Sequence, residues 1–111
     1  QGELPAGDVL VHAGDYTSYG RAPHRAQFRT WLGAQCARFA HVVVINGNHD
    51  DPKEVAPDYA ACCDELRQLA NVAPNAHFVT DNVRGKVLGL SVNDGADVVR
   101  LYACSWRSAC D

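Results

Sequence analysis

Apolar runs that stop at glycine and polar side chains recur in the first half of the chain. Residues 8–15 (DVLVHAGD) and 42–50 (VVVINGNHD) share this form. A short apolar run bounded by turn signals is typical of a strand covered on both faces, as in a parallel sheet. We therefore predict two buried strands, each followed directly by a polar turn.

A helix is predicted between these strands, over residues 23–40. Its apolar side chains recur at helical spacing, and its arginines fall on positions available to solvent. The apolar positions are Phe28, Trp31, Leu32, Cys36 and Phe39, and the arginines are Arg25, Arg29 and Arg38. Gly33 favours an early end, because glycine is a poor helix former. Strand, helix and strand make a βαβ unit, whose right-handed crossover makes the strands parallel.

The second half predicts one more helix and then several short strands. Residues 57–70 carry an apolar face of Tyr59, Cys62, Cys63, Leu66 and Leu69, and Asp58 is a suitable N-cap. Three short runs rich in β-forming residues follow, at 76–80, 86–92 and 98–104, with an NDGAD turn before the last. The predicted fold class is α/β, beginning with a parallel βαβ unit.

Composition and charge argue against nucleic-acid and membrane partners. With 111 residues the chain is one domain at most, and ten basic against thirteen acidic residues give a net charge of −3. No run of Lys and Arg could follow a phosphate backbone, and no stretch reads as a membrane span or a signal peptide. We expect a cytoplasmic protein without a nucleic-acid groove or a membrane partner.

The five cysteines do not suggest a zinc site. They are odd in number and contain no C-x-x-C pair. Reduced, packed thiols are therefore expected.

The polar turns after the two predicted parallel strands would meet at one edge of the sheet. Ligands bind at the carboxyl ends of strands in open α/β sheets. Asp15 supplies a carboxylate there, Asn48 an amide oxygen and His49 an imidazole. This mixed oxygen and nitrogen set suits Mn²⁺, Fe, Zn²⁺ or Mg²⁺. Gly14 and Gly47 would let the backbone turn sharply and admit an ion or phosphate.

Structural explanations exist for each residue taken alone. Asp15 could be a helix N-cap or turn former, Asn48 could accept a left-handed backbone, and residues 48–50 could form an Asx-type turn. The other histidines, His12, His24, His41 and His77, are expected to be structural. The pair of turns, in this order and spacing, favours the ligand-binding hypothesis.

Both motifs resemble those of the calcineurin-like metallophosphoesterases, particularly a small branch of that family. GDVLVHAGD (7–15) resembles its G-D-x-L-[IV]-H-x-G-D motif, FRTWLG (28–33) its Trp-Leu-Gly helix end, and GNHD (47–50) its G-N-H-[DE] turn. VRLYACSW (99–106) resembles the strand and Trp-containing loop that follow. The resemblance covers most of the chain.

The resemblance implies a fold, a chemistry and residue roles. The fold would be part of the family's α-β-β-α sandwich, in which two packed mixed sheets are flanked by helices. The activity would be hydrolysis of a small phosphate ester, either a monoester or a diester, by a hydroxide that two divalent ions activate. Asp15 would be the bridging metal ligand, and Asn48 a ligand of the second metal. His49 would contact the phosphate, and Asp50 would orient that imidazole.

Two motifs of the family do not occur in these residues. No D-x-H is present, and no histidine follows His77, so the G-H-x-H motif is missing. We therefore expect residues 1–111 to be a partial phosphoesterase domain, the middle portion of a longer hydrolase, inactive alone. The alternatives are a non-catalytic interaction scaffold on the same fold and a plain α/β binding domain with two structural turns. The sequence leaves the oligomeric state open.

Overall fold

The element order follows the predicted α/β pattern. The computed structural model describes residues 4–17, 22–47, 50, 59–79 and 84–105, and within these ranges all side chains except those of residues 22, 59, 62, 66 and 70. The elements are β1 (Val9–His12), α1 (Ala22–Arg38), β2 (His41–Ile45), α2 (Tyr59–Gln68), the short 3-10 helix η2 (Leu69–Asn71), β3 (Ala76–Val79), β4 (Lys86–Val92) and β5 (Asp97–Ala103). A βαβ unit, a helix and further strands are confirmed.

The strands form two sheets in the described part of the chain. β1, β2 and β3 pair in parallel in that order, with Leu10 opposite Val42 and Val42 opposite Ala76. β4 and β5 form an antiparallel hairpin. Its turn contains Asn93, Asp94 and Gly95, all with left-handed φ angles, which Asn, Asp and Gly adopt most readily.

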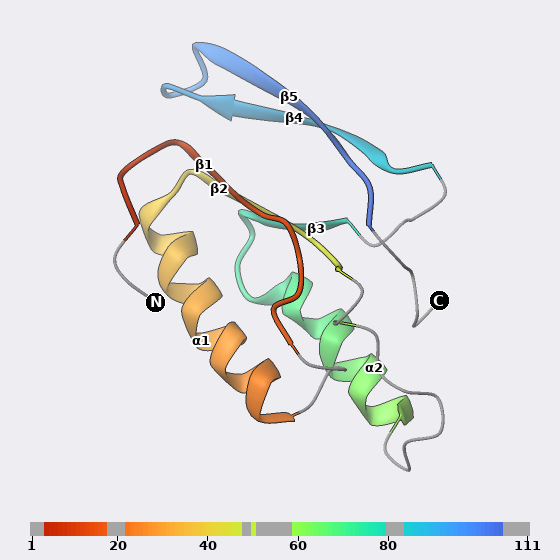
Figure 1. Cartoon of the computed structure of the whole chain (residues 1–111). Coiled ribbons are helices and arrows are strands. Elements are labelled where there is room, and N and C mark those ends of the chain that lie inside the picture. Colours follow the sequence, from red (N-terminus) through yellow and green to blue (C-terminus); the bar gives the residue numbers. More distant parts are fainter. Residues whose placement is uncertain (1–3, 18–21, 48–49, 51–58, 80–83, 106–111) are drawn as a thin grey trace.

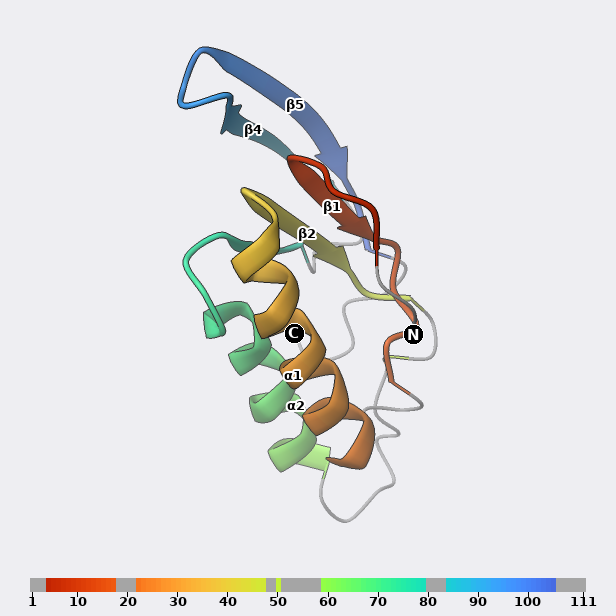
Figure 2. The ribbon, with the colours of Figure 1, turned by 90° about the vertical axis from the view of Figure 1, so that its left-hand side faces the viewer.

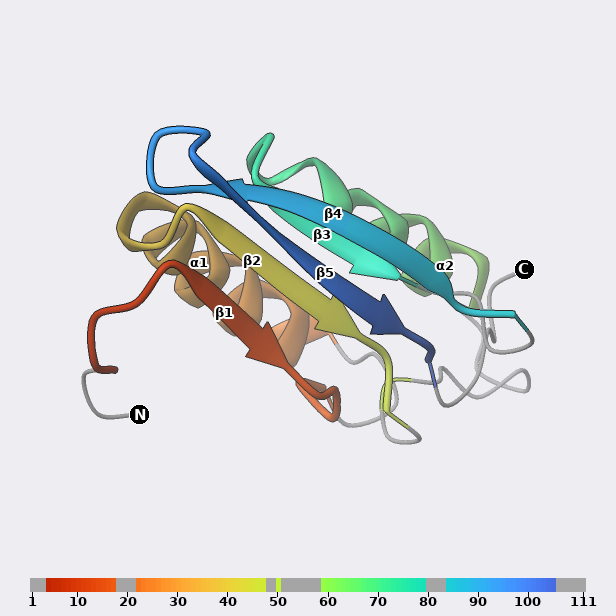
Figure 3. The same ribbon diagram turned by 90° about the horizontal axis from the view of Figure 1, so that it is seen from above.

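The elements lie in three layers. Both helices cover one face of the parallel sheet, and the β4–β5 hairpin lies over the other (Figure 1). The side view in Figure 2 separates the helix layer from the strands, and the view from above in Figure 3 shows the hairpin lying over the parallel sheet, with β5 running in nearly the same direction as β2. The central strand β2 is therefore covered on both faces. The prediction of a buried strand is wrong for β1, because β1 lies at the edge of the sheet and its Val11 is 56% exposed.

The side chains of β2 divide between two cores. Val42 and Val44 pack with Phe28 and Leu32 of α1, whereas Val43 packs with Leu88 of β4 and other hairpin residues. All three valines are at most 1% exposed. Because neighbouring side chains in a strand point to opposite faces, the unbroken apolar run is explained by the two covering layers.

The helix α1 departs from two predictions. It continues through Gly33 to Arg38, because Cys36 and Phe39 beyond the glycine pack into the core. A Cβ on Gly33 would meet only Val72, at an ordinary 3.8 Å. Arg25 is not on a solvent face: it is buried and forms an ion pair with Glu65 of α2, whose nearest atoms are 2.5 Å apart. Tertiary contacts thus override the local signals.

The cysteines follow the prediction in part. Cys36 and Cys104 are free thiols, and burial raises the pKa of Cys36. Cys63 is disulfide-bonded, and the other half of that bond lies outside the described side chains. The expectation of reduced thiols is therefore wrong for Cys63. The predicted cap Asp58 lies outside the described residues.

Within the described ranges, no helix has the length and apolar character needed to cross a membrane.

Candidate metal and phosphate site

The turns after β1 and β2 pack directly against each other. A Cβ atom on Gly14 would lie 2.2 Å from the backbone nitrogen of Gly47, and one on Gly47 would lie 2.3 Å from Oδ1 of Asp15. Real Cβ atoms do not approach other atoms so closely, so both positions require glycine. The glycines therefore permit close packing of the two turns against each other. The sequence had predicted that they admit an ion or phosphate.

Asp15 lies at the carboxyl edge of the parallel sheet, as predicted. Its backbone is left-handed, with a φ of 59°, and its side chain is exposed. A non-glycine residue in this conformation is uncommon, although aspartate accepts it better than most residues. The turn thus holds a carboxylate at the place where the sequence predicted a metal ligand.

Asp50 ties the two turns together. Its Oδ2 accepts hydrogen bonds from the backbone N–H groups of Asp15, at 2.7 Å, and Gly47, at 2.8 Å. Its Oδ1 accepts from the backbone N–H of Thr17, at 2.8 Å, and from the Thr17 hydroxyl, at 3.1 Å. The side chain is buried. Both oxygens of Asp50 are therefore engaged in holding the site's backbone.

Two opposing effects act on the pKa of Asp50. Burial raises this pKa, because a carboxylate is harder to ionise away from water. The hydrogen bonds from Gly47, Thr17 and Asp15 lower it, because they favour the ionised form, but burial is the larger effect. The role predicted for Asp50, orienting His49, remains a prediction, because His49 and the predicted ligand Asn48 lie outside the described residues.

A second set of contacts holds Asn46, the first residue after β2. The Tyr16 hydroxyl donates to Oδ1 of Asn46 at 2.6 Å, and the Asn46 backbone N–H donates to Oγ of Ser105 at 2.9 Å. Sequence reasoning missed Tyr16, Thr17 and Ser105. Tyr16 and Thr17 directly follow the predicted turn, which was a usable signal, whereas nothing local marks Ser105.

His12 is hydrogen-bonded, as its place in an apolar strand indicated. Its Nδ1 accepts from the backbone N–H of Gly14 at 3.1 Å, so Nε2 carries the proton of the neutral ring. Burial lowers the pKa of His12, and the negative charges of Asp50 and Asp15 oppose that shift. The ring makes edge contacts with Phe28 and Trp31. His12 therefore helps to fix the backbone of the turn through Gly14.

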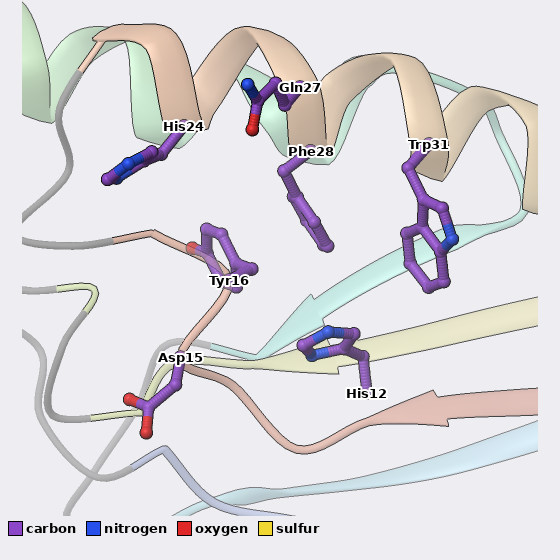
Figure 4. Close-up of a pocket in the computed structure, with 7 residues that line it drawn as sticks. All are labelled: His12, Asp15, Tyr16, His24, Gln27, Phe28 and Trp31. Carbon is purple, nitrogen blue, oxygen red and sulfur yellow. The ribbon is translucent and has the colours of Figure 1, made fainter. Parts of the chain in front are cut away.

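A pocket of about 360 Å³ lies between α1 and the end of β1. Figure 4 shows the α1 side chains on one side of it and His12 on the other, with Asp15 at one end and its carboxylate directed away from the helix. The lining residues are His12, Asp15, Tyr16, His24, Gln27, Phe28 and Trp31. The pocket is largely aromatic and borders the candidate ligand Asp15.

The donor types at this edge suit a hard divalent cation. Asp15 offers carboxylate oxygens, which Mg²⁺ and Mn²⁺ prefer, and it is exposed. Among the residues that the structure describes, no three His, Cys, Asp or Glu side chains gather closely enough to hold a metal ion. Asp15 therefore fits one position of a metal site whose other predicted ligand, Asn48, is not described.

Comparison with known proteins gives a consistent picture. A model of the calcineurin-like phosphoesterase family matches residues 2–103. The human and mouse proteins named metallophosphoesterase domain-containing protein 1 are each 42% identical to this chain over 48 residues. A probable rhamnogalacturonate lyase C of Emericella nidulans is 43% identical over 47 residues.

The matched segments are short relative to those proteins. The 48 residues make up 43% of this chain but 14% of the human and mouse proteins, and the 47 residues make up 42% of this chain and 4% of the Emericella protein. No solved structure matches the chain.

Proposed function

Because this chain belongs to the calcineurin-like phosphoesterase family, we propose that it forms part of a metal-dependent hydrolase of small phosphate esters, either monoesters or diesters. The observation that carries the proposal is the packing of the Gly14–Asp15 turn against the Asn46–Gly47 turn at one edge of the sheet. These are the two turns whose residues resemble the family's metal-binding motifs.

The proposed roles follow the chemistry of each side chain. Asp15 and Asn48 would hold two divalent ions, with Asp15 as the bridging ligand. The ions would supply activation of water and neutralisation of the phosphate charge. His49 would donate a hydrogen bond or a proton to the phosphate ester. Asp50 would orient His49, and its hydrogen bonds to the backbone of Asp15 and Gly47 support a further role in holding the two turns.

The backbone around Asp15 supports this assignment. A carboxylate that is already held in place before the ion arrives binds it more tightly, because less ordering is needed on binding. Here the Asp15 N–H is bonded to buried Asp50, and Gly47 lies against the Asp15 side chain. The backbone of Asp15 is thus held by a hydrogen bond, while the residue remains exposed to solvent.

Activity of the full-length protein tests the proposal. We expect Mn²⁺-dependent hydrolysis of a nitrophenyl phosphomonoester or of the corresponding diester, and loss of this activity with a chelator. Asp15→Asn and His49→Ala should each reduce turnover by about 100-fold or more, in line with the loss of a metal ligand or a proton donor.

A matched control is available for the aspartate. Asp94 is exposed and has a left-handed φ of 55°, close to the 59° of Asp15, but it lies in the β4–β5 turn. Asp94→Asn should leave turnover unchanged. Absence of turnover in the wild-type protein, or equal turnover in the Asp15→Asn and Asp94→Asn variants, would contradict the proposal.

The alternative function is a non-catalytic interaction scaffold on the same fold. The absence of D-x-H and G-H-x-H motifs from these 111 residues favours it. A scaffold should lack one or more of these motifs in the full-length protein as well, whereas an enzyme should contain them. A plain binding domain with two structural turns is the remaining alternative. Metal analysis of the full-length protein tests it, because such a domain should contain no stoichiometric metal.

The location and the partners are also proposals. We propose a cytoplasmic protein on the basis of its composition, and a small phosphate ester as its substrate on the basis of its family. The disulfide bond of Cys63 argues against this location, because disulfides persist mainly in oxidising compartments. Fractionation of cells that produce the full-length protein would test the location.

A further inference from the structure

Two hydroxyl groups from distant parts of the chain hold the residue that begins the second turn. Tyr16 donates to the side-chain oxygen of Asn46 at 2.6 Å, and Ser105 accepts from the Asn46 backbone N–H at 2.9 Å. Asn46 is separated from Tyr16 by 30 residues and from Ser105 by 59. Its position therefore depends on how three separate segments pack.

The Ser105 hydroxyl bridges the ends of two strands. It accepts the Asn46 N–H after β2 and donates to the carbonyl of Val79, the last residue of β3. The side chain is 5% exposed. Ser105→Ala would remove the hydrogen bonds to both the Asn46 N–H and the Val79 carbonyl. Backbone groups that lose a hydrogen bond away from water are unfavourable. Ser105 thereby fixes the spacing of β2 and β3 at the edge that carries the candidate site.

The Tyr16 ring is itself held on two sides. It stacks on Phe28 of α1, with centroids 4.2 Å apart, and meets the edge of Phe78 of β3 at 6.2 Å. The phenolic O–H is a hydrogen-bond donor at neutral pH. The hydroxyl is thus aimed at Asn46 by a fixed aromatic ring.

The held residue is directly linked to the candidate ligands. Gly47, the next residue, donates to Asp50, which also accepts from Asp15. The two turns leave no space between Gly14 and Gly47, so a displacement of one turn must displace the other. Asn48 follows Gly47 in the chain.

From these contacts we infer that Tyr16 and Ser105 are positioning residues of the phosphoesterase site, acting through Asn46 and Gly47 on the turn that packs against Asp15. The inference rests on the proposed function. Neither hydroxyl takes part in the chemistry. The Ser105 hydroxyl accepts from one backbone group and donates to another, and the Tyr16 hydroxyl donates to the Asn46 side chain. Their effect is on where the ligands lie.

Four variants of the full-length protein test the inference. Tyr16→Phe and Ser105→Ala each remove one hydroxyl with little change in shape. Tyr102→Phe and Ser91→Ala are matched controls: the Tyr102 hydroxyl donates to the carbonyl of Arg84, which precedes β4, and Ser91 is an exposed residue of β4.

The expected results concern metal dependence and local backbone protection. Tyr16→Phe and Ser105→Ala should raise the Mn²⁺ concentration for half-maximal activity by roughly 10-fold, as loss of a group that orients metal ligands does, while KM for the ester stays near the wild-type value. In the metal-free protein, amide hydrogen exchange at Asn46 and Gly47 should become faster. The control variants should match the wild type in both measurements.

The outcomes separate the two claims. Wild-type protein without turnover would overturn the proposed function. Active wild-type protein whose Tyr16→Phe and Ser105→Ala variants show the same Mn²⁺ dependence as the controls would overturn the inference, even if both variants melt at a lower temperature. Unchanged amide exchange at Asn46 and Gly47 would overturn it as well.

Discussion

Glycine at position 47 shows how a single residue can determine a site. Its φ is not in the left-handed region, so the requirement there is for space rather than for an unusual backbone conformation. A side chain would collide with both the carboxylate and the backbone nitrogen of Asp15. Gly14 differs, because it needs both the space and its positive φ of 96°. Both glycines allow the two turns to touch. Gly47 is needed for space alone, and Gly14 for space and for its positive φ.

Gly47→Ala should separate the two turns. The new methyl group would lie 2.3 Å from Asp15 Oδ1, so we expect a loss of about 1–3 kcal/mol of unfolding free energy, as for overpacking elsewhere. Gly89→Ala is the control, because its methyl group would meet only Val98, at 3.8 Å. Urea denaturation measures both variants. Equal midpoints for the two would show that the turns are not packed as described.

At the scale of elements, two histidines join the parallel sheet to the hairpin. His41 Nε2 lies 2.8 Å from the carbonyl oxygen of Ser91 on β4, and its Nδ1 lies 3.0 Å from Nε2 of His77 on β3. A carbonyl only accepts, so His41 carries its proton on Nε2, and its Nδ1 accepts from His77. At least one of the two rings must be neutral, because two protonated rings would direct N–H groups at each other. Sequence reasoning missed this link because it treated His41 and His77 separately, each as a structural residue.

Acid should weaken this junction. Burial lowers the pKa of His77 below its usual 6.5, and the charges of His41 and Lys86 lower it further. The unfolded chain therefore binds a proton near pH 6.5 that the folded chain binds only at lower pH, so stability present above pH 6.5 is lost as the pH falls below it.

His77→Gln should reduce this acid sensitivity. Glutamine can still donate to His41 but does not titrate, so the loss of unfolding free energy between pH 7 and pH 5 should be smaller than in the wild type. Part of the loss should remain, because the pKa of His12 is also lowered. Denaturation at a series of pH values gives the comparison, with His24→Gln as control. Identical slopes in all three proteins would exclude a role for the pair.

At the scale of the whole molecule, the hairpin covers the parallel sheet with one face and presents the other to solvent. Leu88, Leu90 and Val92 point inward, whereas Val87, Val98 and Tyr102 are each more than 60% exposed. Together with unpaired strand edges, exposed apolar side chains on a sheet favour association between molecules.

The 111-residue chain should therefore self-associate when it is produced alone. The double variant Val87→Thr and Val98→Thr should reduce this tendency, because threonine keeps the β-branched shape and replaces an apolar group by a hydroxyl. Light scattering at increasing protein concentration measures the effect, with Ser91→Thr as control. A monomeric wild-type chain with a sharp thermal transition would contradict the expectation.

Local sequence determined the elements that bring the candidate site together. The apolar run of β2, the helical stripe of α1 and the polar turns at Asp15 and Asn46 were readable because periodicity and turn preference act over neighbouring residues. The three-dimensional structure decided what holds them. Asp50 bonds to Asp15 and Ser105 bonds to Asn46 only because the elements pack in one particular way, and contacts between residues 35 and 59 positions apart leave no local pattern in a sequence.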